Sequence, residues 1–194
     1  MNLKINDIIE VTCFEVDYNG NGVSRYNNLI VFTKGLLVDE KAKVVITKVQ
    51  KKFLNAKILN LITKNTDRKD LLHNLNALDL FHLNENMQNK WQITTTIKTF
   101  NKIAKIELDD NINIISNNEY LYYRNKSVFH VLNNKQLTLG LYDNDYNLVK
   151  VDNFLLSSKI TNKALSEINS LAFDLKHLQG NLKHIVFRNN QKQE

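Results

Sequence analysis

The chain has 194 residues, of which 43% are hydrophobic, so it can bury a core as one large domain or two small ones. Its formal net charge is +6 at pH 7, and its only cysteine is Cys13, which excludes an intrachain disulfide and any metal site built from clustered cysteines. No apolar run approaches the roughly 18 residues of a membrane helix, and the N-terminus lacks a signal-peptide layout, so we expect a cytoplasmic protein without membrane partners.

The positive charge is concentrated near the N-terminus. Residues 1–69 hold 12 Lys or Arg against 7 Asp or Glu, whereas residues 70–194 hold 14 against 13. Residues 41–64 contain seven lysines and no acid. A localised basic stripe suits a polyanion partner, although a charge run taken alone is as often only a solvated face.

Residues 1–65 predict a small closed β-barrel. Four segments alternate between apolar and polar residues and are separated by turn sequences such as NGNG. They cover residues 4–18, 28–33, 41–50 and 53–64. Four or five short strands in this length are typical of a closed barrel.

The glycine-rich turn between the first strands suggests a phosphate contact. Gly20 and Gly22 permit positive φ at a loop tip and close approach of another backbone, and Arg25 and Lys34 flank them. The turn joins strand to strand, so it does not suit a dinucleotide, whose pyrophosphate needs the N-terminus of a following helix.

Residues 66–194 predict an α+β domain with two amphipathic, core-facing helices. Residues 91–106 place Ile93, Ile97, Phe100 and Ala104 at helical spacing. Residues 162–180 repeat the pattern, from Leu165 to Leu178, and we expect Gly180 to cap that helix.

The side chains of the types that serve catalysis or metal binding have structural interpretations in this sequence. His73, His82, His130, His177 and His184 lack metal-site spacing. The ELDDN segment at 107–111 predicts a solvated helix end rather than an acid–base pair. Cys13 lies in the first predicted strand, where a small buried thiol is the ordinary interpretation.

Several segments resemble the RNA (uracil-5-)-methyltransferase family in the same order. Residues 18–58, from YNGNGVSRY to the basic strand pair, resemble its N-terminal TRAM domain, an RNA-binding barrel. LFHLNENMQNKWQ resembles the family's Gln-His-Leu segment, with Phe81 in place of Gln. YRNKSVFHV, LTLGLYDNDY and GNLKHIVFRNNQ, which ends near Arg188, resemble strands of its central domain.

The resemblance implies a fold and limits the activity. We expect an OB-like TRAM barrel followed by an incomplete α+β central domain with an unpaired sheet edge, without the Rossmann methyltransferase domain. In the family, a cysteine adds to the uracil ring and S-adenosylmethionine donates the methyl group. The parts that perform this chemistry would lie after Glu194, so we expect no catalysis and no cofactor in this chain.

The resemblance also predicts that an iron–sulfur cluster is absent. Some family members carry four cysteine ligands, and here Leu75, Leu78 and Phe154 align with ligand positions. Leucine and phenylalanine cannot bind iron but can fill the vacated volume, so we expect a hydrophobic plug.

The resemblance gives the segment EYLYYRNKSVFHV a role in RNA binding. We interpret it as a strand that places Tyr122, Arg124 and Lys126 on one face and Tyr123 and Asn125 on the other. Arg124 and Lys126 would hold phosphate, and Tyr123 would stack on a base. The predicted RNA-binding residues are Arg25, Lys34, Lys48, Lys51, Lys52, Tyr123, Arg124 and Lys126.

We therefore predict the RNA-binding N-terminal half of an rRNA uracil-5-methyltransferase-like protein, with ribosomal RNA as its partner and with catalysis lost or encoded on a separate chain. One alternative is a fragment or subunit of an active, S-adenosylmethionine-dependent 23S rRNA uracil-5-methyltransferase. A second alternative is a basic assembly protein without an RNA role.

Overall fold

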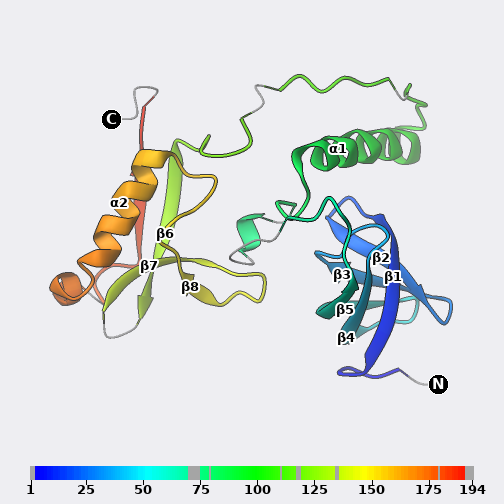
Figure 1. Cartoon of the computed structure of the whole chain (residues 1–194), viewed down its shortest axis with the longest axis horizontal. Helices are drawn as coiled ribbons and strands as arrows, with labels where there is room; N and C mark the ends of the chain where they lie inside the picture. Colours follow the sequence, from blue (N-terminus) through cyan, green and yellow to red (C-terminus); the bar gives the residue numbers. More distant parts are fainter. Residues whose placement is uncertain are drawn as a thin grey trace. The chain divides into compact units, whose positions relative to one another are not determined.

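A computed structural model describes residues 3–69, 75–78, 80–109, 111–116, 119–133, 136–178 and 180–190. The chain forms two compact units, which Figure 1 shows as ribbons. The first unit combines Met1–Leu72 with Leu78–Ile114, and the second combines His73–Ala77 with Ile115–Glu194. The predicted boundary after residue 65 stays an interpretation of the sequence. It follows the last barrel strand by two residues.

The first unit contains the predicted barrel. Its strands are β1 (Ile8–Val16), β2 (Asn21–Tyr26), β3 (Leu29–Lys34), β4 (Lys41–Val49) and β5 (Phe53–Thr63). They close in the order β1-β2-β3-β5-β4, with β3 and β5 parallel and every other pair antiparallel. The prediction of a small OB-like barrel ahead of an α+β region is confirmed.

Strand β2 corrects the interpretation of the glycine-rich turn. Gly20 has φ of +79° and lies in the β1–β2 loop, as predicted, but Gly22 lies inside β2 and has no positive φ. A Cβ at Gly22 would lie 2.4 Å from the backbone oxygen of Leu36. Gly22 therefore serves close backbone approach rather than a loop tip.

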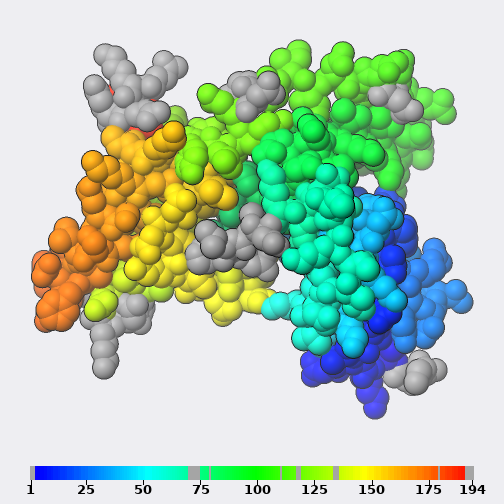
Figure 2. All heavy atoms as spheres, in the orientation of Figure 1, coloured from blue at the N-terminus to red at the C-terminus, as the bar shows by residue number. Residues whose placement is uncertain are grey.

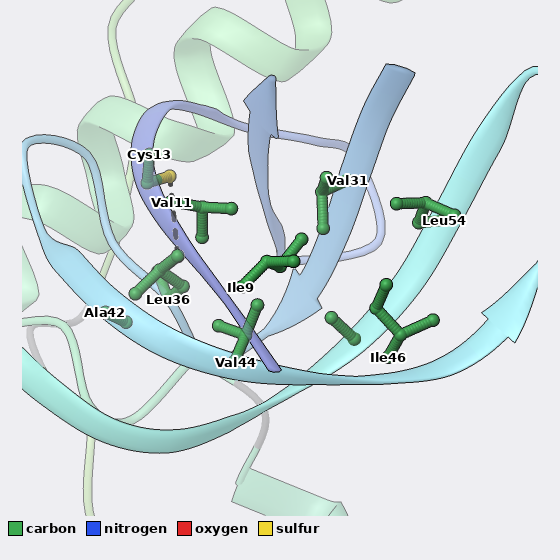
Figure 3. Packing of buried hydrophobic residues seen from close by; sticks show 10 residues of the cluster. Ile9, Val11, Cys13, Val31, Leu36, Ala42, Val44, Ile46 and Leu54 are labelled. Atoms are coloured by element: carbon green, nitrogen blue, oxygen red, sulfur yellow. Dashed lines mark hydrogen bonds between the residues drawn. The ribbon is translucent and has the colours of Figure 1, made fainter. Parts of the chain in front are cut away.

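Alternation along the strands builds the barrel core. In β1, Ile9, Val11 and Cys13 are buried, whereas the residues between them are exposed. They pack with Val31, Leu36, Ala42, Val44, Ile46, Leu54 and Ala56 (Figure 3). Cys13 is 1% exposed, so the expectation of a buried cysteine is confirmed, and burial raises the pKa of its thiol to about 11.

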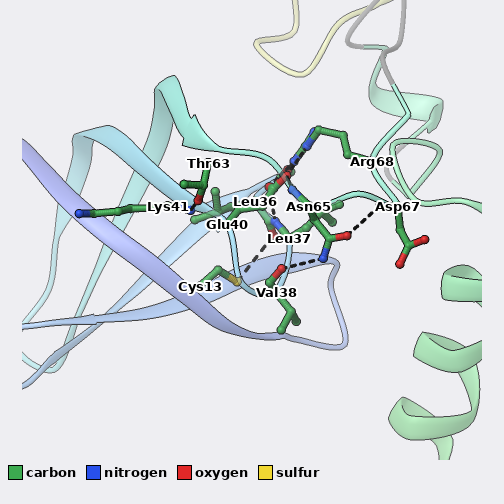
Figure 4. A network of polar contacts seen from close by, with 11 residues as sticks. Cys13, Leu36, Leu37, Val38, Glu40, Lys41, Thr63, Asn65, Asp67 and Arg68 are labelled. Carbon is green, nitrogen blue, oxygen red and sulfur yellow. Dashed lines mark hydrogen bonds and ion pairs between the residues drawn. The ribbon is translucent and has the colours of Figure 1, made fainter.

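A buried ion pair fastens the chain after β5 to the barrel (Figure 4). Arg68 donates from Nε and Nη2 to the two Glu40 carboxylate oxygens, each at 2.6 Å. The backbone N–H groups of Leu37 and Asn65 donate to the same carboxylate at 2.8 and 3.1 Å. Burial alone would raise the pKa of Glu40, but these hydrogen bonds outweigh it and lower the pKa.

The first predicted helix forms, but it does not face a core. Helix α1 (Glu85–Thr99) begins at the N-cap Asn84, continues into the π-helical turn η2 (Phe100–Ala104), and contains no buried residue. Phe100 is 44% exposed. The helix contacts the barrel strands and the β1–β2 loop through polar groups, since Trp91 Nε1 donates to the Asp17 carbonyl and Lys98 pairs with Glu15. Helical spacing of apolar residues therefore overstated its burial.

The second unit is a two-layer α+β structure. Its strands are β6 (Lys126–Asn133), β7 (Leu137–Tyr142), β8 (Leu148–Lys150) and β9 (His184–Arg188), in the sheet order β8-β7-β6-β9. Helix α2 (Lys159–Ser170) packs against it, and its Asn169 side chain bonds the Leu139 N–H and the Val151 carbonyl. Figure 2 shows α2, in orange, beside the segment that follows β8, in yellow.

Helix α2 is amphipathic, as predicted, but shorter. It ends at Ser170, and a 3₁₀ turn, η3 (Asp174–Leu178), follows it. Gly180 has φ of +83° but follows η3, so it does not cap α2. Leu165 is buried in the core as expected, whereas Leu171 is 48% exposed because the helix ends before it.

The segment 119–125 is not a strand, which corrects the predicted alternation of its side chains. Tyr122 has φ of +60°, and β6 begins only at Lys126. The segment instead runs beside residues 155–158, because the Tyr122 and Arg124 N–H groups donate to Leu155 and Leu156 carbonyls at 2.8 Å. No tyrosine of this segment is fully buried.

Leu75 and Phe154 of the second unit are 2% and 3% exposed, and Leu78 is 5% exposed. The three residues that the resemblance aligned with cluster ligands are thus all buried apolar side chains, and the absence of an iron–sulfur cluster stays a prediction. Within the described part, no helix is long and apolar enough to cross a membrane.

Candidate nucleic-acid interface

The barrel unit carries a cavity of about 790 Å³ on the outer side of β2 and β3. Residues of the β1–β2 loop and Lys102 of the π-helical turn η2 also line it. Its aromatic and basic lining residues are Phe14, Tyr18, Phe32, Arg25, Lys34 and Lys102.

Strand register explains why these side chains meet. Val23 lies opposite Phe32, and Asn21 lies opposite Lys34, in the antiparallel β2–β3 pair. Phe32 also lies opposite Asn55 in the parallel β3–β5 pair. Since directly opposite residues point to the same face, the outer positions of three strands form one surface. The intervening residues, such as Val31 and Leu54, fill the barrel core.

The cavity combines exposed rings with cationic side chains. Tyr18 is 71% exposed and Phe14 is 51% exposed, so both offer ring faces to solvent. Two acids also line it, but the Asp17 carboxylate accepts hydrogen bonds from the β1–β2 loop, and Glu15 pairs with Lys98. Rings for stacking beside cations for phosphate are the combination that unpaired nucleic acid requires.

Three of the seven lysines of residues 41–64 lie at the neighbouring β4–β5 hairpin. Lys48, Lys51 and Lys52 are all exposed. The hairpin closes with a hydrogen bond from the Gln50 N–H to the Phe53 carbonyl at 2.9 Å. The Phe53 ring packs edge-on against Phe32, with centroids 5.6 Å apart, so the hairpin rises beside the cavity wall. In OB folds, the strand 2–3 face and the 4–5 loop bind oligonucleotides.

Tyr123, Arg124 and Lys126 lie in the second unit and are all exposed. The Arg124 guanidinium lies 5.7 Å from the centroid of the Phe154 ring. Its backbone N–H bonds Leu156, and its carbonyl accepts from Ser158, the N-cap of α2. The structure thus groups the eight predicted residues into a barrel set of five and a second set of three, and their role in RNA binding stays a prediction.

Sequence reasoning missed the aromatic half of the cavity and Lys102. Phe14 follows the buried Cys13 in an alternating strand, so an aromatic residue at an outward position was a readable signal. Phe32 had the same signal in β3. No sequence signal pointed to Lys102, because its position at the cavity depends on how α1 packs on the barrel.

The histidines are spread over different environments. His82 is buried, His130 is half-buried, and His177 and His184 are exposed, whereas His73 lies outside the described residues. In the part of the chain that the structure describes, no group of three or more His, Cys, Asp or Glu could hold a metal ion.

Comparison with known proteins assigns the barrel. Residues 3–59 match the family model of the TRAM domain. An RNA methyltransferase of Fusobacterium nucleatum is 24% identical over 205 residues, which cover 99% of this chain and 44% of the relative. A 23S rRNA (uracil(1939)-C(5))-methyltransferase of Shewanella woodyi is 29% identical over 131 residues, or 64% of this chain and 30% of the relative. The barrel is a TRAM domain, and the chain is similar over most of its length to RNA methyltransferases.

A solved structure shares the fold. The tRNA (uracil-54, C5)-methyltransferase of Pyrococcus abyssi superposes with a TM-score of 0.64 at 13% identity, over 95% of this chain and 44% of that protein. The chain therefore spans less than half the length of the RNA methyltransferases it matches, and it corresponds to their N-terminal TRAM domain and central region.

Proposed function

We propose that this chain binds RNA as the N-terminal part of an RNA uracil-5-methyltransferase-like protein, and that ribosomal RNA is its partner. The observation that carries the proposal is the cavity of the TRAM barrel, where Arg25 and Lys34 stand beside Phe14, Tyr18 and Phe32. The rings would stack on unpaired bases, and the cations would hold the flanking phosphates. The relative from Shewanella woodyi supports ribosomal RNA as the target.

We also propose that these 194 residues do not perform the methyl transfer. A nucleophilic cysteine must reach the uracil ring and become a thiolate. The sequence has one cysteine, Cys13, which is 1% exposed in the barrel core, where burial raises its pKa to about 11. A further domain or a separate chain would have to supply the nucleophile and the S-adenosylmethionine site.

We also propose that this chain holds no iron–sulfur cluster. Leu75, Leu78 and Phe154 occupy the aligned ligand positions, and all three are buried apolar side chains. These residues do not fit an iron–sulfur cluster, because none offers a sulfur or nitrogen donor. We propose that hydrophobic packing replaces it.

A second candidate function follows from the coverage of the relatives. The chain spans 44% of the Fusobacterium RNA methyltransferase, so the second candidate is a fragment or subunit of an active enzyme, a 23S rRNA uracil-5-methyltransferase like the relative from Shewanella woodyi. The RNA-binding role of the barrel is the same in both cases. Addition of a catalytic chain that restores methylation would favour this candidate.

The test is fluorescence anisotropy with a labelled ribosomal-RNA stem-loop over a salt series. The double substitution Arg25→Ala and Lys34→Ala should weaken binding and reduce the salt slope by about 0.7 to 0.9 units for each phosphate that the protein no longer neutralises. Lys43→Ala is the matched control, since Lys43 is an exposed β4 lysine that does not line the cavity. Equal affinities for the native chain and the double variant would contradict the proposed site.

A further inference from the structure

The sheet of the second unit has one packed face and one accessible face. Phe129 and Phe187 lie on the packed face, where the Phe129 ring meets those of Phe154 and Phe187 at 6.3 and 5.8 Å between centroids. On the opposite face, Val128 and Val186 are directly paired and are 36% and 45% exposed. Core packing therefore accounts for one side of the sheet only.

Three rings cluster on the accessible face. His130 of β6 lies opposite His184 of β9, and their ring centroids are 6.4 Å apart. The His130 ring also contacts Tyr142 of β7 at 4.9 Å, and Tyr142 is 42% exposed. Gly140, the β7 partner of His130, adds no side chain between the strands, because a Cβ there would lie 2.1 Å from the Val149 carbonyl oxygen.

The strands that form this face, β6, β7, β8 and β9, carry basic but no acidic residues. Lys126 and Arg188 are direct partners in the β6–β9 register, so two cations stand side by side at one end of the face. Lys150 is paired with Asp152 at 3.3 Å and is not counted among them.

We infer that the open sheet face, defined by Lys126, His130, Tyr142, His184 and Arg188, is a second RNA-binding surface that takes unpaired nucleotides. Bases stack on the exposed rings, while Lys126 and Arg188 hold phosphates. The core of a protein–protein interface is depleted in charge, whereas this face pairs rings with cations, so it suits RNA better than a second protein. The inference rests on the proposed partner being RNA, but it uses none of the barrel residues.

The probe is a single-stranded RNA of about ten nucleotides, a length within the range of one binding module. It carries 2-aminopurine, whose fluorescence is quenched when this base stacks on an aromatic ring. With the full chain, Tyr142→Ala and His184→Ala should each weaken binding about tenfold and reduce the quenching. Lys126→Ala combined with Arg188→Ala should lower the salt slope by about 1.4 units on single-stranded RNA.

Matched controls use the same unit. Phe173→Ala removes a ring that is 62% exposed in the turn after α2, and Lys163→Ala removes an exposed charge on α2. Both should bind as the native chain does, and unchanged circular dichroism would show that all variants fold. If Tyr142→Ala and His184→Ala match Phe173→Ala, the inference is overturned, although a weakened Arg25 and Lys34 variant would still uphold the proposed function. If the native chain binds no RNA, both fail.

Discussion

At the residue scale, the Glu40–Arg68 pair shows how one buried carboxylate fixes the exit of the chain from the barrel. Glu40 is fully buried, and Arg68 also donates to the Gly35 carbonyl at 2.5 Å. Removing one partner of such a pair leaves the other charged and buried. Arg68→Ala should therefore destabilise the barrel unit by about 3–5 kcal/mol in urea unfolding. A loss under about 1 kcal/mol, the range of exposed ion pairs, would contradict this account.

The same pair gives the stability a pH dependence. The pKa of Glu40 is below its ordinary value of 4.5 in the folded chain, so the unfolded chain takes up the proton more readily. The stabilisation is complete above that ordinary value and is lost as the pH falls through the folded pKa. The difference in unfolding free energy between the native chain and Glu40→Gln should therefore narrow in acid. A constant difference from pH 7 to pH 3 would exclude this role for Glu40.

Cys13 allows a direct check of the claim that this chain lacks a nucleophile. Its thiol lies 3.1 Å from the Glu15 carbonyl oxygen in the barrel interior, and burial raises its pKa to about 11. A thiol-reactive dye should therefore label the folded chain far more slowly at pH 8 than the urea-unfolded chain. Fast labelling of the folded chain would show a reactive, accessible thiol.

At the element scale, the absence of a side chain at Gly22 in β2 lets the β3–β4 connection pass close to this strand. A side-chain Cβ at position 22 would lie 2.4 Å from the Leu36 oxygen, so Gly22→Ala must move backbone and should cost about 1–3 kcal/mol in thermal unfolding. Gly35→Asn is the control, because nothing lies within 4 Å there and asparagine tolerates its positive φ. A control that costs more than Gly22→Ala would refute the close-approach explanation.

The strands were easier to predict than the helices and the irregular segments. Alternation located β1, β3, β4 and β5, because apolar and polar residues alternate with a period of two along a half-buried strand. It did not separate β2 from the glycine-rich turn, since Gly22 has no side chain to carry the pattern. For α1, the apolar spacing was present but the burial was absent, because burial depends on a packing partner as well as on periodicity.

Of the residues that line the barrel cavity, the sequence analysis predicted only the basic side chains Arg25 and Lys34. Arg25 and Lys34 stood out beside the glycine-rich turn, whereas Tyr123 and Arg124 depended on a family resemblance. Tyr122 has a positive φ, which does not fit the predicted strand. The alternation of side chains gives no signal for such a backbone angle. The Glu40–Arg68 contact joins residues 28 positions apart, and only the closed barrel brings them together.

At the scale of the whole molecule, most of the excess positive charge lies in residues 1–69, which include the barrel. The basic residues gather in the TRAM barrel and at its β4–β5 hairpin, and the strands of the second unit contain cations without acids. Charge alone would bind any polyanion, whereas rings beside cations should favour single-stranded regions of RNA. An RNA-binding function therefore predicts that the chain prefers RNA to other polyanions.

The most direct measurement compares the native chain on three polyanions: a ribosomal-RNA stem-loop, duplex DNA and heparin, each over the same salt series. We predict the tightest binding to the stem-loop, and a preference that persists as salt rises, because stacking is less sensitive to salt than phosphate contacts are. Equal affinity for all three at every salt concentration would reduce the basic stripe to a solvated face and contradict an RNA-binding function.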